Sequence, residues 1–130
     1  MTTLIEQIST TRAPAPAGHY AQATAWRDLV FVSGQLPHHA AGTHMSDASF
    51  EIQARQAVAN LLAVVTEAGS NPERVLRVTA YVVGVENWPV FNRIYAELFG
   101  AAKPARAVVP VPELHHGYLV EIEAVASRGI

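Results

Sequence analysis

The segment "PARAVVPVPEL", residues 104–114, is followed after a short loop by "LVEIEAVA", residues 119–126. Both segments are rich in small and β-branched apolar residues, and the second alternates polar and apolar positions, which is typical of β-strands. The first contains one arginine, Arg106, and the second contains two glutamates, Glu121 and Glu123. These two segments predict the sheet on which the fold is built, and the presence of Arg106, Glu121 and Glu123 within the predicted strands needs a physical reason.

Successive side chains of a strand point to opposite faces of the sheet, so alternation assigns each residue a face. The predicted core residues are Val120, Ile122, Ala124 and Ala126 in the second strand, and Ala105, Ala107, Val109 and Val111 in the first. If the two strands form a hairpin whose core residues pack on helices, Arg106, Glu121 and Glu123 share the opposite, helix-free face.

The prolines of the first strand, Pro104, Pro110 and Pro112, are in phase with Arg106 and Val108. Proline lacks an N–H group, so this edge of the strand cannot carry a full ladder of hydrogen bonds. The N–H groups of Arg106 and Val108 are therefore candidates to bind an anion, and an arginine beside them suits a carboxylate. An ion pair between arginine and glutamate at a subunit interface is the commoner arrangement from physics alone, and both interpretations stay open.

Two further patterns upstream predict strands. Residues 20–37, "YAQATAWRDLVFVSGQLP", contain two β-rich runs on either side of Arg27 and Asp28, which predicts a hairpin. Residues 75–83, "VLRVTAYVV", are rich in valine, threonine and tyrosine. The fold is expected to start near Tyr20, after an irregular lead-in over residues 1–18.

Two segments have the period of amphipathic helices. The first begins after Ser49, a suitable N-cap, and stops at Gly69; the second begins at Asn87 and stops at Gly100. Their apolar stripes are Ile52, Val58, Leu61, Leu62 and Val65 in the first, and Phe91, Ile94, Tyr95, Leu98 and Phe99 in the second. The predicted fold class is α+β, in the order β-β-α-β-α-β-β, as a mixed sheet with both helices on one face.

Length and composition narrow the possible functions. The 130 residues suit a single domain, 1–130, and the contents of 50% hydrophobic and 15% charged residues favour burial between copies of the chain. A net charge of −2 offers no basic field for nucleic acid, and without cysteine there is no thiol nucleophile or thiolate metal site. No signal peptide or membrane span is apparent, so we expect a cytoplasmic protein without membrane contacts.

Six histidines raise the question of a metal site. His38 with His39, and His115 with His116, are adjacent pairs in predicted loops. No H-x-E or HExxH pattern accompanies them. Surface histidines, and no bound metal, are therefore the expectation.

The segment "PARAVVPVPELHHGYLVEIEAVA" resembles the C-terminal signature of the RidA family, also called YjgF. The resemblance extends backwards through "FNRIYAELF", "RVTAYVVGVENW", "QARQAVANLLAVVTEAG", "VFVSGQLP" and "APAGHYAQA", and covers nearly the whole chain in order. It implies a chorismate-mutase-like fold and a homotrimer with clefts between subunits.

The resemblance also implies an activity of the 2-iminobutanoate/2-iminopropanoate deaminase type, which counts as metabolite damage control. Such a hydrolase converts reactive 2-enamine and 2-imine carboxylic acids, such as 2-aminoacrylate, into 2-keto acids and ammonium, without a cofactor. The family's carboxylate-binding arginine corresponds to Arg106, and its water-orienting glutamate to Glu121. The family's substrate-binding positions fall on Tyr20, Ser33, Gly34, Asn92 and, through its backbone, Val108.

Glu123 is expected to make an ion pair or a hydrogen bond instead. This chain departs from the family pattern at two cleft positions: Val108 replaces a common cysteine, and His19 replaces a proline. Together with the His115-His116 loop, these changes concern the size and shape of the substrate. Two alternatives follow: a specialised catabolic deaminase, acting on 2-aminomuconate or a pyrimidine-derived aminoacrylate, and a non-catalytic trimer that binds a small carboxylate.

Overall fold

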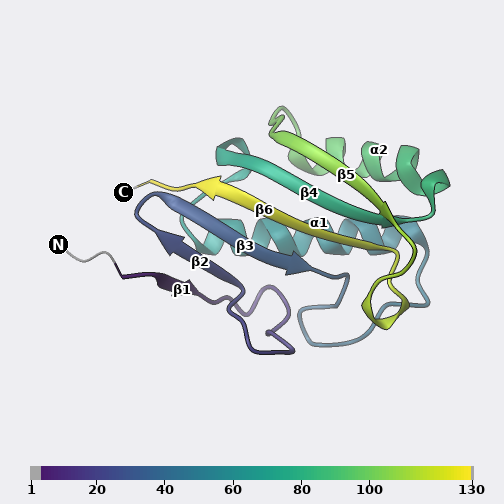
Figure 1. The fold of residues 1–130 in the computed structure, drawn as a ribbon, viewed down its shortest axis with the longest axis horizontal. Helices are drawn as coiled ribbons and strands as arrows, with labels where there is room; N and C mark the ends of the chain where they lie inside the picture. The colour runs from purple at the N-terminus through teal and green to yellow at the C-terminus, as the bar shows by residue number, and fades with distance from the viewer. Residues whose placement is uncertain (1–3, 130) are drawn as a thin grey trace.

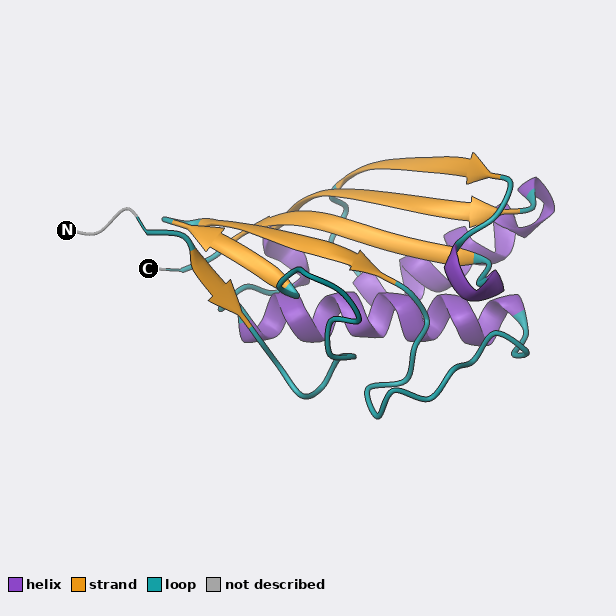
Figure 2. Ribbon diagram, turned by 60° about the horizontal axis from the view of Figure 1, so that its bottom comes forward, coloured by secondary structure: helices purple, strands orange, loops and turns teal. Residues whose placement is uncertain are grey.

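The chain forms a six-stranded mixed sheet with two α-helices packed on one face, as seen in Figures 1 and 2. This is a computed structural model, and it describes residues 4–129. The strands are β1 (Glu6–Ile8), β2 (Ala23–Trp26), β3 (Leu29–Gln35), β4 (Val75–Val83), β5 (Ala105–Val111) and β6 (Val120–Ser127). The helices are α1 (Phe50–Glu67) and α2 (Trp88–Phe99), with short 3-10 turns η1 (Pro72–Arg74), η2 (Val85–Asn87) and η3 (His115–Gly117). The predicted α+β class and the placement of both helices on one face are confirmed.

The strand order is β1-β2-β3-β6-β4-β5. The last strand, β6, lies between β3 and β4 and is antiparallel to both, while β5 is parallel to β4 at the edge of the sheet. The predicted hairpin between β5 and β6 is therefore wrong. The crossover through α2 returns the chain parallel to β4, which places β5 on the outer side of β4, and the inner side is filled by β6 (Figure 1).

The hydrophobic core lies between the sheet and the helices. Val30, Val78 and Ile122 are fully buried on the sheet side, and Leu61 and Ile94 meet them from α1 and α2. Burying each such side chain stabilises the fold by roughly 1.5–3 kcal/mol. The predicted core residues of β6 (Val120, Ile122, Ala124 and Ala126) are all buried.

The helix boundaries agree closely with the predicted caps. The Ser49 hydroxyl accepts a hydrogen bond from the Ile52 N–H at 3.3 Å, and Gly69 has the positive φ of +87° that glycine adopts beyond a helix end. Asn87 occupies the predicted cap position of α2, but its side chain donates to the Val83 carbonyl at 2.9 Å and does not cap the helix. Ile52 is 49% exposed and does not belong to the buried stripe of α1.

The predicted irregular lead-in, residues 1–18, is more ordered than its sequence indicates. Residues 1–3 lie outside the described part of the chain, but β1 pairs with β2. The buried Gln22 side chain donates to the carbonyls of Thr10 at 3.0 Å and Pro14 at 2.8 Å. One buried amide thereby holds the lead-in beside the start of β2, where Pro14, Ala15, Ala17 and Gly18 form a wall of the larger cavity described below.

In the described part of the chain, the other face of the sheet carries no helix (Figure 2). Phe31 is 46% exposed there, and Val109 of β5 is 36% exposed. Phe31 is paired with Val125, and Tyr81 with Glu121 and Val109, so apolar and acidic side chains share this face. Within residues 4–129, neither helix has the length and hydropathy that a membrane span requires.

Candidate active site in two cavities

Arg106 lies on the helix side of the sheet, which contradicts the predicted helix-free placement. Its partner in the parallel register is Val78, a core residue with no exposed surface. Partners in a parallel pair point to the same face. The error arose because the small residues of β5 were assigned to the core, whereas at this sheet edge Ala105 and Ala107 lie on the helix-free face.

The Arg106 guanidinium rests on an aromatic ring. Its central carbon lies 4.8 Å from the ring centroid of Tyr95 in α2, a cation–π distance. Among residues 4–129, Arg106 forms no ion pair within the chain. Its positive charge is therefore positioned and available to an anion.

The first cavity, the Arg106 cavity, measures about 260 Å³ and includes Asn92, Tyr95 and Lys103 in its lining. Tyr95 was predicted as a core residue, and it is 6% exposed. Its hydroxyl is buried without a hydrogen-bond partner in the described chain, and burial, opposed by Arg106, raises the pKa of Tyr95 to about 12. The tyrosine is thus a neutral platform for the guanidinium.

The second cavity, the Glu121 cavity, measures about 460 Å³. It brings together four of the predicted site residues: Tyr20, Ser33, Gly34 and Glu121. Glu121 comes from β6, and Ser33 and Gly34 come from β3, where the register with β6 shifts between Val32 and Gln35. Such an irregularity re-aims side chains, and here it sets Gly34 directly beneath the carboxylate.

Gly34 leaves the space that the Glu121 carboxylate occupies. A Cβ atom at position 34 would lie 2.6 Å from Glu121 Oε2 and 3.2 Å from its Cδ. Real Cβ atoms do not approach an oxygen this closely, so any side chain at position 34 would move the carboxylate. The neighbouring Ser33 hydroxyl donates to the Ala21 carbonyl at 2.7 Å, which fixes the other wall of the cavity.

The surroundings of Glu121 favour the protonated form of its carboxyl group. Burial, followed by the nearby charge of Glu123, raises the pKa of Glu121, and His115 partly opposes this effect. Within residues 4–129 no hydrogen bond or ion pair holds this carboxylate. Glu123, two residues away, accepts a hydrogen bond from the Tyr81 hydroxyl at 3.2 Å, which confirms its predicted hydrogen-bonded role.

The predicted site residues therefore fall into two groups. Tyr20, Ser33, Gly34 and Glu121 line one cavity, and Asn92 and Arg106 line the other. Val108 lines neither, and its side chain packs against the core. Because Arg106 and Glu121 point to opposite faces of the same sheet, one chain cannot bring them together.

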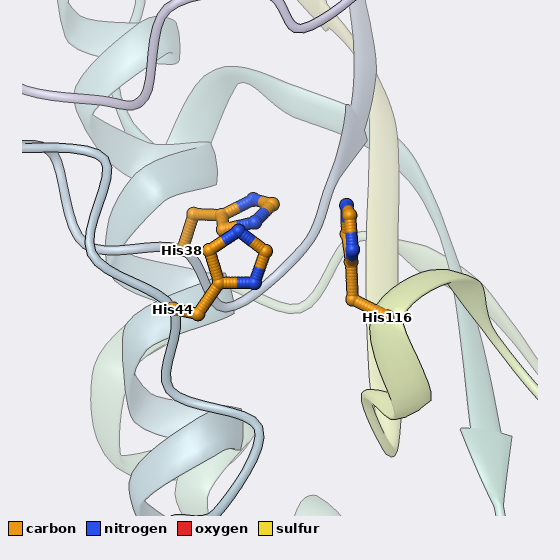
Figure 3. A group of neighbouring side chains, drawn as sticks. All are labelled: His38, His44 and His116. Atoms are coloured by element: carbon orange, nitrogen blue, oxygen red, sulfur yellow. The ribbon is translucent and has the colours of Figure 1, made fainter.

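The structure also assembles a group that the sequence did not indicate. Ligand atoms of His38, His44 and His116 all lie within 4.8 Å of one another (Figure 3). His38 and His116 were interpreted as members of separate surface pairs, and His44 was not singled out. No local pattern could have grouped them, since more than half of the chain separates His44 from His116.

Fold and cavities together define the class: a small α+β protein with the Glu121 cavity on one face of its sheet and the Arg106 cavity on the other. The model of the family described as endoribonuclease L-PSP matches residues 10–128. A RutC family protein of Pyrococcus abyssi is 35% identical over 123 residues, covering 95% of this chain and 97% of that protein. The 2-iminobutanoate/2-iminopropanoate deaminase of Bos taurus is 32% identical over 130 residues, covering 99% and 95%.

A solved structure with a similar fold supports the same family. The crystal structure of Escherichia coli TdcF with bound serine superposes with a TM-score of 0.90 at 30% identity, covering 95% of this chain and 99% of that chain. This chain belongs to the endoribonuclease L-PSP family, also called the YjgF or RidA family.

Proposed function

We propose that this protein is a hydrolytic deaminase of 2-imino and 2-enamino carboxylic acids. The observation that carries the proposal is the Glu121 carboxylate, which lies in a cavity, has no ion-pair partner within residues 4–129, and has a raised pKa. A carboxyl group in such a state is suited to take and return a proton. The relative from Bos taurus that is named an iminobutanoate deaminase supports the same class of substrate.

The active site would be completed by a second copy of the chain. Arg106 and Glu121 lie on opposite faces of one sheet, so a substrate that touches both must lie between two chains. We propose a homotrimer with clefts between subunits, in which one subunit supplies Arg106 and Asn92 and the next supplies Glu121 with its cavity. The apolar surface of the helix-free face, including Phe31 and Val109, supports burial against sister subunits.

The proposed chemistry requires little beyond positioning. Arg106, with the backbone N–H groups at the β5 edge, would anchor the substrate carboxylate; the serine bound to TdcF carries a carboxylate of the same kind. Glu121 would take a proton from a water molecule as its oxygen attacks the electrophilic carbon of the protonated imine. In the resulting carbinolamine, Glu121 would return that proton to the nitrogen, which leaves as ammonia, and would take up the hydroxyl proton as the keto group forms and release it to solvent.

This sequence of steps needs no metal or organic cofactor, because the imine carbon is already electrophilic. It consumes one water and releases one ammonia for each keto acid, so the atoms balance. The net charge of −2 supplies no basic field for a nucleic-acid substrate, which supports a small-molecule partner. A cytoplasmic location, where pyridoxal-phosphate enzymes release 2-aminoacrylate, is part of the proposal.

The test is to generate 2-aminoacrylate from serine with a pyridoxal-phosphate dehydratase and to follow pyruvate formation with and without this protein. We expect acceleration over the spontaneous rate. Arg106→Ala should lower the acceleration about tenfold to a hundredfold, since a charge-assisted contact contributes roughly 1.5–3 kcal/mol. Arg77→Ala is the matched control, because Arg77 is an exposed arginine that lines neither cavity.

Two results would overturn the deaminase proposal: no acceleration by the wild-type protein, or equal acceleration by Arg106→Ala. A panel of enamines that includes 2-aminomuconate would distinguish a general deaminase from a specialised one. Binding of a small carboxylate without turnover of any member would identify a non-catalytic binder instead.

A further inference from the structure

The histidine cluster at the rim of the Glu121 cavity has no role in the proposed deamination. Its ring centroids form a triangle, with 4.6 Å between His38 and His44, 4.6 Å between His44 and His116, and 5.3 Å between His38 and His116. Figure 3 shows the three rings close together between the loop that follows β3 and the 3-10 turn η3. Three imidazoles at this spacing are the donor set of a transition-metal site.

The loop that carries two of the histidines is folded by its own hydrogen bonds. The His39 N–H donates to the Thr43 carbonyl at 3.0 Å, and the Gly42 N–H donates to the His39 carbonyl at 2.8 Å. This turn reverses the chain between His38 and His44 and sets their side chains next to each other. The proximity of His38 and His44 therefore follows from the backbone conformation of this loop.

Buried polar side chains of α1 hold the same loop from below. Asn60, 1% exposed, donates to the His38 carbonyl at 2.8 Å. Gln53, fully buried, donates to the Ala48 carbonyl at 3.0 Å and accepts from the Leu119 N–H at 2.9 Å. The loop and the segment after η3 are thus tied to one helix, which keeps the ligand positions in register.

The ring of Tyr118 packs beneath the histidine cluster. It is fully buried, and its hydroxyl accepts a hydrogen bond from the Met45 N–H at 3.0 Å, next to His44. Its ring centroid lies 5.1 Å from that of His38 and 6.2 Å from that of His116. Preorganisation of this kind, by packing and by hydrogen bonds outside the ligand set, is what metal sites require.

His116 is held in an unusual backbone conformation. Its φ of +63° lies in the left-handed region, which is rare outside glycine and has a free-energy cost. That conformation sets its ring on the same side as the other two.

We propose that His38, His44 and His116 bind one divalent transition-metal ion, with Zn²⁺ as the best match. Tetrahedral zinc holds imidazole nitrogens at about 2.0–2.1 Å, which puts them about 3.3 Å apart. The present separations, up to 4.8 Å, close to this value by small rotations of the exposed His44 and His116 side chains. Three neutral nitrogen donors exclude Mg²⁺ and Ca²⁺, which prefer oxygen.

The fourth position of the ion would face the Glu121 cavity, since His38 and His116 are part of its lining. The bound ion would join the loop after β3 to η3 and so set the shape of the cavity mouth. A water molecule, or a carboxylate entering the cavity, is a suitable fourth ligand. The proposal stands independently of the deaminase activity.

The test uses the full-length protein without a histidine tag, dialysed against a chelator and then titrated with Zn²⁺ in a calorimeter. We expect one ion per chain, and a thermal midpoint higher by about 5 °C or more once free Zn²⁺ is about a hundredfold above the dissociation constant. Co²⁺ in place of Zn²⁺ should produce the intense visible absorption of a tetrahedral site.

His44→Ala and His116→Ala, tested separately, should each weaken Zn²⁺ binding at least about tenfold and abolish the Co²⁺ spectrum. His39→Ala and His19→Ala are the matched controls, because both are exposed histidines outside the cluster, and both should bind as wild type. Circular dichroism without metal checks that each variant is folded.

Absence of Zn²⁺ binding up to about 1 mM would overturn the proposal, since weaker association is non-specific. Equal affinity of His44→Ala, His116→Ala and His39→Ala would also overturn it, because the ion would then be held elsewhere. Loss of binding in both cluster variants, with binding retained in both controls, supports it.

Discussion

The Arg106 cavity and the Glu121 cavity hold side chains of opposite charge that differ in their exposure to solvent. Arg106 is exposed, lies on the helix side of the sheet, and is supported by the ring of Tyr95. Glu121 is half-buried on the other side, above Gly34, and burial raises its pKa. An exposed fixed cation suits the capture of an anionic group, whereas a partly desolvated carboxyl suits proton transfer.

In the proposed mechanism, one chain therefore holds two halves of a site. Anchoring and proton transfer both act on a molecule a few ångströms long, yet the sheet separates the two groups. The proposed subunit cleft resolves this by pairing one cavity with its complement on a neighbour. The following experiments test whether the two cavities differ in role and whether they cooperate across chains.

The largest expected effect is at Glu121. Glu121→Gln removes the proton acceptor and should lower kcat for 2-aminoacrylate by at least about a hundredfold, while Glu123→Gln, its neighbour on the same strand, should have a much smaller effect. The raised pKa means that the charged carboxylate is less favourable in the folded state than in the unfolded one. The thermal midpoint of Glu121→Gln at neutral pH should therefore not fall. A kcat close to wild type would remove Glu121 from the chemistry.

Mixed oligomers test whether the two cavities act together. Arg106→Ala and Glu121→Gln chains, each poorly active alone, should recover about one quarter of wild-type activity when refolded together in equal amounts. With random mixing, one cleft in about four takes its Arg106 from a Glu121→Gln chain and its Glu121 from an Arg106→Ala chain, so that both groups are intact. The measurement is pyruvate formation by the mixture, with each variant mixed with itself as control. Activity no higher than the mean of the two variants would show that no cleft is shared between chains.

A smaller effect is expected at Gly34. Gly34→Ala should lower kcat/KM about tenfold, because the new Cβ moves the Glu121 carboxylate, and small misplacements of a catalytic group are costly. The fold should persist, since the obstructing atom is the end of a flexible side chain. Gly129→Ala, where a Cβ would meet nothing within 4 Å, is the control. Unchanged kinetics in Gly34→Ala would show that the position of this carboxylate does not matter.

The smallest effect is a displacement of the pH profile. As a base, Glu121 must be deprotonated, so kcat/KM should fall as pH drops through its raised pKa. Glu123→Gln removes the neighbouring negative charge that contributes to that rise, and the acidic limb should move to lower pH with little change in the plateau. The measurement is kcat/KM against pH for both proteins. A shift to higher pH would contradict the assigned electrostatics.

Much of the fold could be predicted from local patterns. Ser49 and Gly69 mark the first helix because capping and left-handed backbone depend on a few neighbouring residues. The faces of β6 were also predicted, since a strand flanked on both sides alternates cleanly between Ile122 in the core and Glu121 outside. The β1 strand was missed because only three residues form it.

The site was harder to predict. The family resemblance selected Arg106 and Glu121 as a pair, but the phase of β5 was assigned from residue size, which fails at a sheet edge where core and surface residues are similarly small. Tyr95 was assigned to the core correctly, while its contact with Arg106 depended on the face that β5 presents to α2. No sequence pattern indicated that His44 would lie near His38 and His116.

The sequence by itself determined the order of the elements, their caps and the alternation within each strand, because these follow from interactions over a few residues. Only the tertiary structure decided which strand lies beside which, and with it the face of Arg106, the separation of the two cavities and the gathering of His38, His44 and His116. These depend on contacts between segments distant in the chain, where the free energy of packing the whole core selects one arrangement among several that are locally equivalent.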